Sequence, residues 1–154
     1  AFVDIANKML KRIRDAYRKK SIIFEHGANH EGSITACGTN HAHLHIIPYE
    51  KSLLKQMFHD DSVQWIECKI TDVERIVQKK EYWFYAENVV DIEDAKGYIH
   101  IIEKPESQYF RRLLAEKEGY TKEYDYKCNL FLDKGEATYA SLVKKYDEER
   151  TDSN

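Results

Sequence analysis

From His41 to Pro48 the sequence reads His-Ala-His-Leu-His-Ile-Ile-Pro, and this alternation of histidine with apolar residues fits an extended strand. Successive side chains of a strand point to opposite faces, so His41, His43 and His45 would share one face and the apolar residues between them the other. A buried imidazole needs a partner for each ring nitrogen, which makes three in a row unsuited to a core. The segment is therefore predicted to be a sheet strand with a candidate site on its histidine face.

Three interpretations of the histidine face are open. The rings can simply alternate on an exposed strand. They can bind zinc, because His-x-His on a strand offers two ligands to one metal. Two observations argue against zinc. The third ring stands about 6.6 Å or more from the middle one along the strand, and no carboxylate or cysteine lies at ligand spacing beside the motif. The preferred interpretation is a nucleophilic imidazole, with one nitrogen attacking phosphorus and the other held by a hydrogen bond. No metal and no cofactor are expected.

The motif and its surroundings resemble a known family. His-Ala-His-Leu-His-Ile-Ile matches the His-φ-His-φ-His-φ-φ signature, with φ apolar, of the histidine triad superfamily of nucleotide hydrolases and transferases. Residues 22–27, Ile-Ile-Phe-Glu-His-Gly, and 36–40, Ala-Cys-Gly-Thr-Asn, resemble the approach to the active histidines in the galactose-1-phosphate uridylyltransferase branch. Residues 106–112, Glu-Ser-Gln-Tyr-Phe-Arg-Arg, are similar to a stretch in bacterial members. The similarity covers about residues 4–126 and is specific around 22–48.

The resemblance implies that His43 is the nucleophile of a nucleotide hydrolase or nucleotidyltransferase, forming a covalent nucleotidyl-histidine at an α-phosphate. His41 and His45 would bind phosphate oxygens and position the ring. The expected substrate is a nucleotide or nucleotide conjugate, with base and leaving group left open. The alternative is a non-catalytic nucleotide-binding or protein-interaction module with the same fold, and a zinc-dependent hydrolase is a third, less favoured, option.

Further substrate-binding residues are expected on three segments beside the motif. The resemblance implies that Glu25 lies near the attacked phosphate or the ribose. Backbone N–H groups of the polar loop 27–40 can wrap a phosphate, a helix start near residue 107 can donate to one, and an arginine can bind one bidentately. The expected set is Glu25, His26, Gly38, Thr39, Asn40, Ser107, Gln108 and Arg111.

Composition excludes some classes of partner. The net charge of −3 and pI near 6.2 provide no basic field for nucleic acid. No apolar run approaches the ~20 residues that a membrane span needs. Cys37, Cys68 and Cys128 are odd in number and widely spaced, which favours a reducing compartment over a disulfide framework. A cytoplasmic protein that binds neither membrane nor nucleic acid is expected.

The predicted fold is α+β, a histidine-triad-like and mostly antiparallel sheet with helices packed on one face. The 154 residues are expected to form a single domain. Members of the superfamily normally carry several strands before the first helix predicted here, so residues 1–154 are expected to lack the usual N-terminal strands, as a fragment or a shortened member. Members often pair, which implies a homodimer. Apolar spacing predicts helices over 4–20, 49–59, 72–80, 108–114 and 137–146, and strands over 21–24, 41–47, 64–70, 82–87, 98–102 and 129–132.

Overall fold

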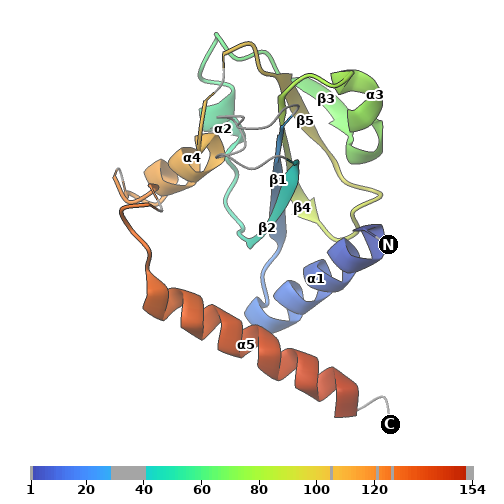
Figure 1. Ribbon diagram of the computed structural model, residues 1–154, viewed down its shortest axis with the longest axis vertical. Helices are drawn as coiled ribbons and strands as arrows, with labels where there is room; N and C mark the ends of the chain where they lie inside the picture. The colour runs from blue at the N-terminus through green and yellow to red at the C-terminus, as the bar shows by residue number, and fades with distance from the viewer. Residues whose placement is uncertain (1, 29–40, 105, 121, 126, 152–154) are drawn as a thin grey trace.

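The computed structural model describes residues 2–28, 41–104, 106–120, 122–125 and 127–151, with side chains as far as 144. Five strands form one antiparallel sheet in the order β2-β1-β4-β5-β3 (Figure 1). Their bounds are β1 Ser21–Gly27, β2 His43–Pro48, β3 Ile66–Lys69, β4 Tyr82–Val89 and β5 Lys96–Ile101. The α+β class and the antiparallel sheet predicted from the sequence are confirmed.

The described part of the chain contains five α-helices and one short 3₁₀ turn, η1, at Ile70–Asp72. The helices are α1 Phe2–Tyr17, α2 Leu54–Met57, α3 Val73–Val77, α4 Tyr109–Lys117 and α5 Leu132–Thr151. Helix α1 buries Ala6, Leu10 and Ile13, which lie on one stripe at the spacing of helical turns. The exposed charged residues Asp4, Lys8, Lys11 and Arg14 lie outside this stripe.

The helices cover both faces of the sheet, which differs from the single covered face expected. Figure 1 shows the sheet nearly edge-on, with α1 and α3 on one side and α2 and α4 on the other. Alternate residues of the central strands are buried on both sides: Ile23 packs with α1 and α3, whereas Ile22 and Phe24 pack with α2 and α4. Because β1 and β4 are apolar on both faces, each face needs a cover.

The end of the chain also differs from the prediction. Residues 129–131 form no strand, and helix α5 already begins at Leu132. Leu130 and Leu132 are 67% and 68% exposed, so their side chains are not buried against the sheet. Helix α5 instead runs beside α1 (Figure 1).

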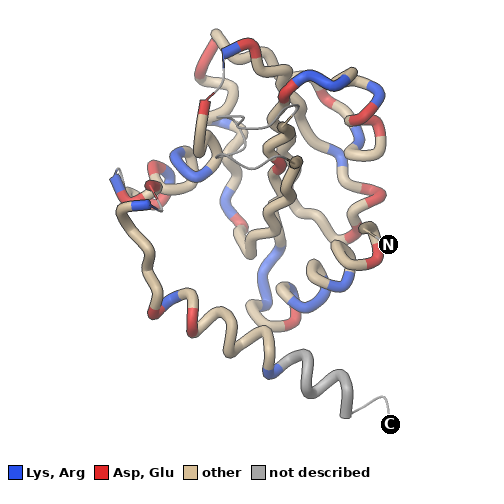
Figure 2. The backbone as a smooth tube through the Cα atoms, in the orientation of Figure 1, with Lys and Arg blue, Asp and Glu red and all other residues tan. Residues whose placement is uncertain are grey.

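Charged residues lie mainly on helices and loops. Figure 2 shows both signs scattered around the molecule, while strand β2 carries no charged residue. None of the described helices is both long enough and apolar enough to cross a membrane.

Candidate functional site

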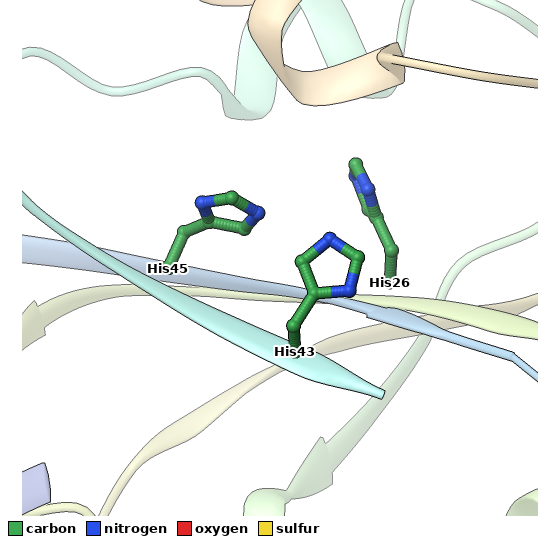
Figure 3. Close-up of side chains that lie close together, drawn as sticks. All are labelled: His26, His43 and His45. Atoms are coloured by element: carbon green, nitrogen blue, oxygen red, sulfur yellow. The ribbon is translucent and has the colours of Figure 1, made fainter. Parts of the chain in front are cut away.

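Strand pairing builds a cluster of three imidazoles from two strands. In the antiparallel pair of β1 and β2, His26 lies opposite His43 and Phe24 lies opposite His45. Partners opposite each other across a pair, and residues two apart along a strand, share one face of the sheet. His26, His43 and His45 therefore project together from the face covered by α2 and α4 (Figure 3).

The three rings approach one another closely. Ring centroids are 5.0 Å apart for His43 and His45, 5.6 Å for His26 and His43, and 5.8 Å for His26 and His45. One nitrogen from each ring lies within 4.8 Å of the other two. Figure 3 shows a nitrogen of His43 and one of His45 directed into the space between the rings. The arrangement presents several imidazole nitrogens to one small volume.

His26 is the buried member of the cluster. Its side chain is 1% exposed and stacks on Phe110 of α4, with centroids 5.6 Å apart and ring planes 13° apart. Both of its ring nitrogens are buried and have no hydrogen-bond partner among the described residues. Buried polar atoms are almost always paired, so the two nitrogens of His26 call for a partner such as a bound ion or a water molecule.

The backbone of His41 contacts the ring of His43. Its Nδ1 lies 3.4 Å from the carbonyl oxygen of His41. A carbonyl only accepts hydrogen bonds, so this contact favours the tautomer with the proton on Nδ1 and the lone pair on Nε2. The His41 ring itself is exposed and stands before the strand begins, 6.5 Å from the His43 ring.

Two of the imidazoles are held neutral. Burial, with smaller contributions from His45, His43 and Arg111, lowers the pKa of His26 to about 3. Burial also lowers the pKa of His45 to about 4, with smaller contributions from His43 and Arg111. At neutral pH both rings therefore keep a free lone pair on one nitrogen.

Glu25 lies across the sheet from the imidazoles. It pairs with Leu44, which packs against the core on the α1 side, and its Oε2 accepts a 2.8 Å hydrogen bond from the hydroxyl of Tyr82. Burial raises the pKa of Glu25, and the bond from Tyr82 and the charge of His43 only partly offset this. The structure therefore does not group this carboxylate with the three rings.

Helix α4 supplies the other wall of the site. A cavity of about 310 Å³ is lined by His45, Arg111, Phe24 and Tyr124, among others.

Gln108 is buried immediately before the helix, with φ of 60°, and no side chain caps the helix start, so α4 begins one residue later than predicted. Two larger cavities of about 610 Å³ each lie elsewhere, one near Arg14 and Asn88 and one near Glu25 and Val73.

The predicted site residues thus fall into separate groups. The structure brings together His26, His43 and His45, with Arg111 beside them. His41 contributes its carbonyl, Ser107 and Gln108 precede α4, and Glu25 faces away. Gly38, Thr39 and Asn40 lie outside the described residues.

The comparisons found no relative. No protein-family model, curated protein or solved structure matches this chain. Membership of the histidine triad superfamily therefore stays a prediction from the sequence motifs.

Phe24 and Phe110 are the residues of the site that the sequence did not single out. Phe24 stacks on His45 with centroids 4.5 Å apart, and Phe110 stacks on both Phe24 and His26. Phe24 stands two residues before His26, so the alternation of β1 already put it on the face of that imidazole. No comparable signal marks Phe110, because its position depends on how α4 docks.

Proposed function

We propose that this protein is a nucleotide hydrolase or nucleotidyltransferase that works through a covalent intermediate on His43. The observation that supports this best is the tautomer of His43 favoured by the His41 carbonyl, with a lone pair on Nε2 beside two neutral imidazoles. An imidazole held at one nitrogen is oriented for attack through the other. The family resemblance of the motif supports the same role.

In the proposed reaction, Nε2 of His43 attacks the α-phosphorus of a nucleotide or nucleotide conjugate. A P–N bond forms, and the bond from phosphorus to the leaving-group oxygen or nitrogen breaks, with the electron pair departing on that atom. The ring takes up positive charge, which the Nδ1–H donated to the carbonyl oxygen of His41 offsets. Water or another acceptor then attacks phosphorus and gives up its proton to solvent, the P–N bond breaks, and its electron pair returns to Nε2.

Arg111 is the residue that we propose binds the phosphate. It lines the same cavity as His45, and its charge acts on both His26 and His45. A guanidinium group can bind two oxygens of a phosphate at once. The cavity volume of about 310 Å³ is at the lower end of the range for small-molecule sites. We infer that the phosphate lies between α4 and the imidazoles.

The test is a trapped intermediate. The chain is incubated briefly with an adenosine phosphoramidate, in the presence of EDTA, and its intact mass is measured. The proposal predicts a nucleotidyl adduct or turnover in the wild type and in His59→Ala, an exposed histidine on the loop after α2, and neither in His43→Ala. Absence of adduct and turnover in the wild type across a panel of adenylated and uridylylated nucleotides would overturn it, and nucleotide binding without reaction would favour a binding module.

A further inference from the structure

The buried histidine of the cluster points to a second chemistry. His26 holds two buried ring nitrogens with no hydrogen-bond partner among the described residues, beside two other imidazoles. The proposed attack through Nε2 of His43 assigns these two nitrogens no role. A ligand that accepts electron pairs from several imidazoles at once would supply one.

We propose that His26, His43 and His45 form a binding site for Zn²⁺, with an open fourth position facing α4. Each ring offers one nitrogen, and the three nitrogens lie within 4.8 Å of one another. Zinc accepts imidazole nitrogen at about 2.0–2.1 Å in tetrahedral geometry, which places ligand atoms about 3.4 Å apart. The separation between any two of these nitrogens therefore has to shorten by about 1.5 Å at most for the three rings to bind the ion.

The fold allows this closure while fixing one ligand. His26 lies on β1, an interior strand, and is held by stacking on Phe110. His43 and His45 lie on β2, the edge strand of the sheet, and are only partly buried. Rotation of these two side chains can bring their nitrogens toward the fixed ring of His26.

The donor set selects the type of metal. Imidazole suits Zn²⁺ and neighbouring transition metals, whereas Mg²⁺ and Ca²⁺ require oxygen ligands. The carboxylate of Glu25 is bonded to Tyr82 across the sheet, so it adds no oxygen to the set. Nδ1 of His43 lies against the carbonyl oxygen of His41, the kind of partner that fixes the ring of a metal-binding histidine.

Spacing within the motif argued against a zinc site because it counts only the histidines at positions 41, 43 and 45. His41 is too far along the chain to join His43 and His45, and in the structure it precedes β2. The third ligand comes instead from β1, where pairing sets His26 opposite His43. The zinc site thus uses two histidines of the motif and one that lies 17 positions before His43.

Binding of Co²⁺ tests this independently of any enzymatic activity. The full chain, without a histidine tag, is stripped with EDTA, dialysed and titrated with Co²⁺ while its visible absorption is recorded. The proposal predicts one Co²⁺ per chain with the intense bands of four-coordinate geometry, and displacement by Zn²⁺, which generally binds more tightly. A stoichiometry other than one, or only the weak bands of six-coordinate Co²⁺, would overturn it.

Variants identify the ligands. His26→Phe and His43→Gln should each weaken Co²⁺ binding by more than ~100-fold, because loss of even an outer-shell partner costs 10–100-fold. His41→Gln and His59→Gln are the matched controls, and both should bind as the wild type does. Circular dichroism checks folding; if His26→Phe does not fold, His43→Gln on the edge strand decides. Unchanged binding in His43→Gln, or loss in His41→Gln, would contradict the assigned ligands.

The metal and the reaction are separable in these experiments. Metal binding is read from absorption without nucleotide, and the adduct on His43 is read by mass in EDTA. Failure of the proposed reaction leaves the Co²⁺ result intact, and absence of a Co²⁺ site leaves the adduct test intact.

Discussion

Two glycine-to-alanine substitutions should change the stability of this protein in opposite directions. Gly97 lies buried in β5, where it pairs with Ala86 of β4 and Cys68 of β3. A Cβ at this position would stand 2.0 Å from the carbonyl oxygen of Tyr85 and 2.8 Å from the Cβ of Ala86. Since the nearest atom is backbone of a buried neighbouring strand, no side-chain rotation can relieve the overlap.

The cost follows from the displacement required. Moving a Cβ from 2.0 Å to an ordinary contact of about 3.5 Å separates β5 from β4 by more than about 1 Å, which breaks ladder hydrogen bonds. Overpacking costs about 1–3 kcal/mol, and a rigid backbone partner puts Gly97→Ala at about 3 kcal/mol or more. That is a large part of the total stability of about 5–15 kcal/mol of a typical domain.

Gly135 is the matched control, since it lies within α5 and a Cβ there meets nothing within 4 Å. Alanine in a helix interior is favoured over glycine by about 0.5–1 kcal/mol, so Gly135→Ala should stabilise. Urea unfolding followed by tryptophan fluorescence, which reports on Trp65 and Trp83, measures Gly97→Ala, and far-ultraviolet circular dichroism measures Gly135→Ala. A loss below about 1 kcal/mol for Gly97→Ala, or a loss of any size for Gly135→Ala, would refute the reasoning.

Two further predictions concern packing and thiol reactivity. Phe110 is fully buried among aromatic rings, so Phe110→Ala should lower the free energy of unfolding by about 3–5 kcal/mol in the same urea assay. The side chain of Phe2 is 61% exposed, so Phe2→Ala should change this free energy by less than about 0.5 kcal/mol. Equal effects of the two substitutions would contradict the assigned core. Burial, with the charge of Asp72, raises the pKa of Cys68 to about 11, while Cys128 is exposed. Only the thiolate reacts, so iodoacetamide at pH 8 should modify Cys128 well before Cys68, and the rate at Cys68 should keep rising toward pH 11. Peptide mapping by mass spectrometry measures both rates, and modification of Cys68 at the rate of Cys128 at pH 8 would count against the shifted pKa.

Local patterns in the sequence predicted most of the elements. The alternation after His41 predicted strand β2, and the helical spacing of Leu10 and Ile13 predicted α1. Both patterns depend only on a short window, because the period of the apolar residues reflects the backbone geometry of one element. The predicted strand over 129–132 was wrong, because an apolar run cannot by itself distinguish a strand from the start of a helix such as α5.

What the sequence could not predict depends on pairing between elements. His26 was expected near the substrate, but its place as the third ring of the cluster follows from the β1–β2 register. His41 was expected to share the strand face, yet β2 begins two residues later. Phe110 reaches His26 only because α4 docks on this face of the sheet. Register and docking arise from many weak contacts over the whole core, and no short window of sequence contains them.

The two proposals for this site compete for one electron pair. Nε2 of His43 can attack phosphorus or coordinate Zn²⁺, and Nδ1 is not available in its place while its proton is donated to the carbonyl of His41. If both proposals hold, Zn²⁺ must inhibit nucleotidyl transfer, and raising the nucleotide concentration must relieve the inhibition. The size of the effect follows from mass action. When free Zn²⁺ is at ten times its dissociation constant, only about a tenth of the enzyme keeps a free nucleophile, and each further tenfold rise in Zn²⁺ lowers that fraction about tenfold. If added nucleotide does not relieve the inhibition, Zn²⁺ binds at another site and His43 is not one of its ligands.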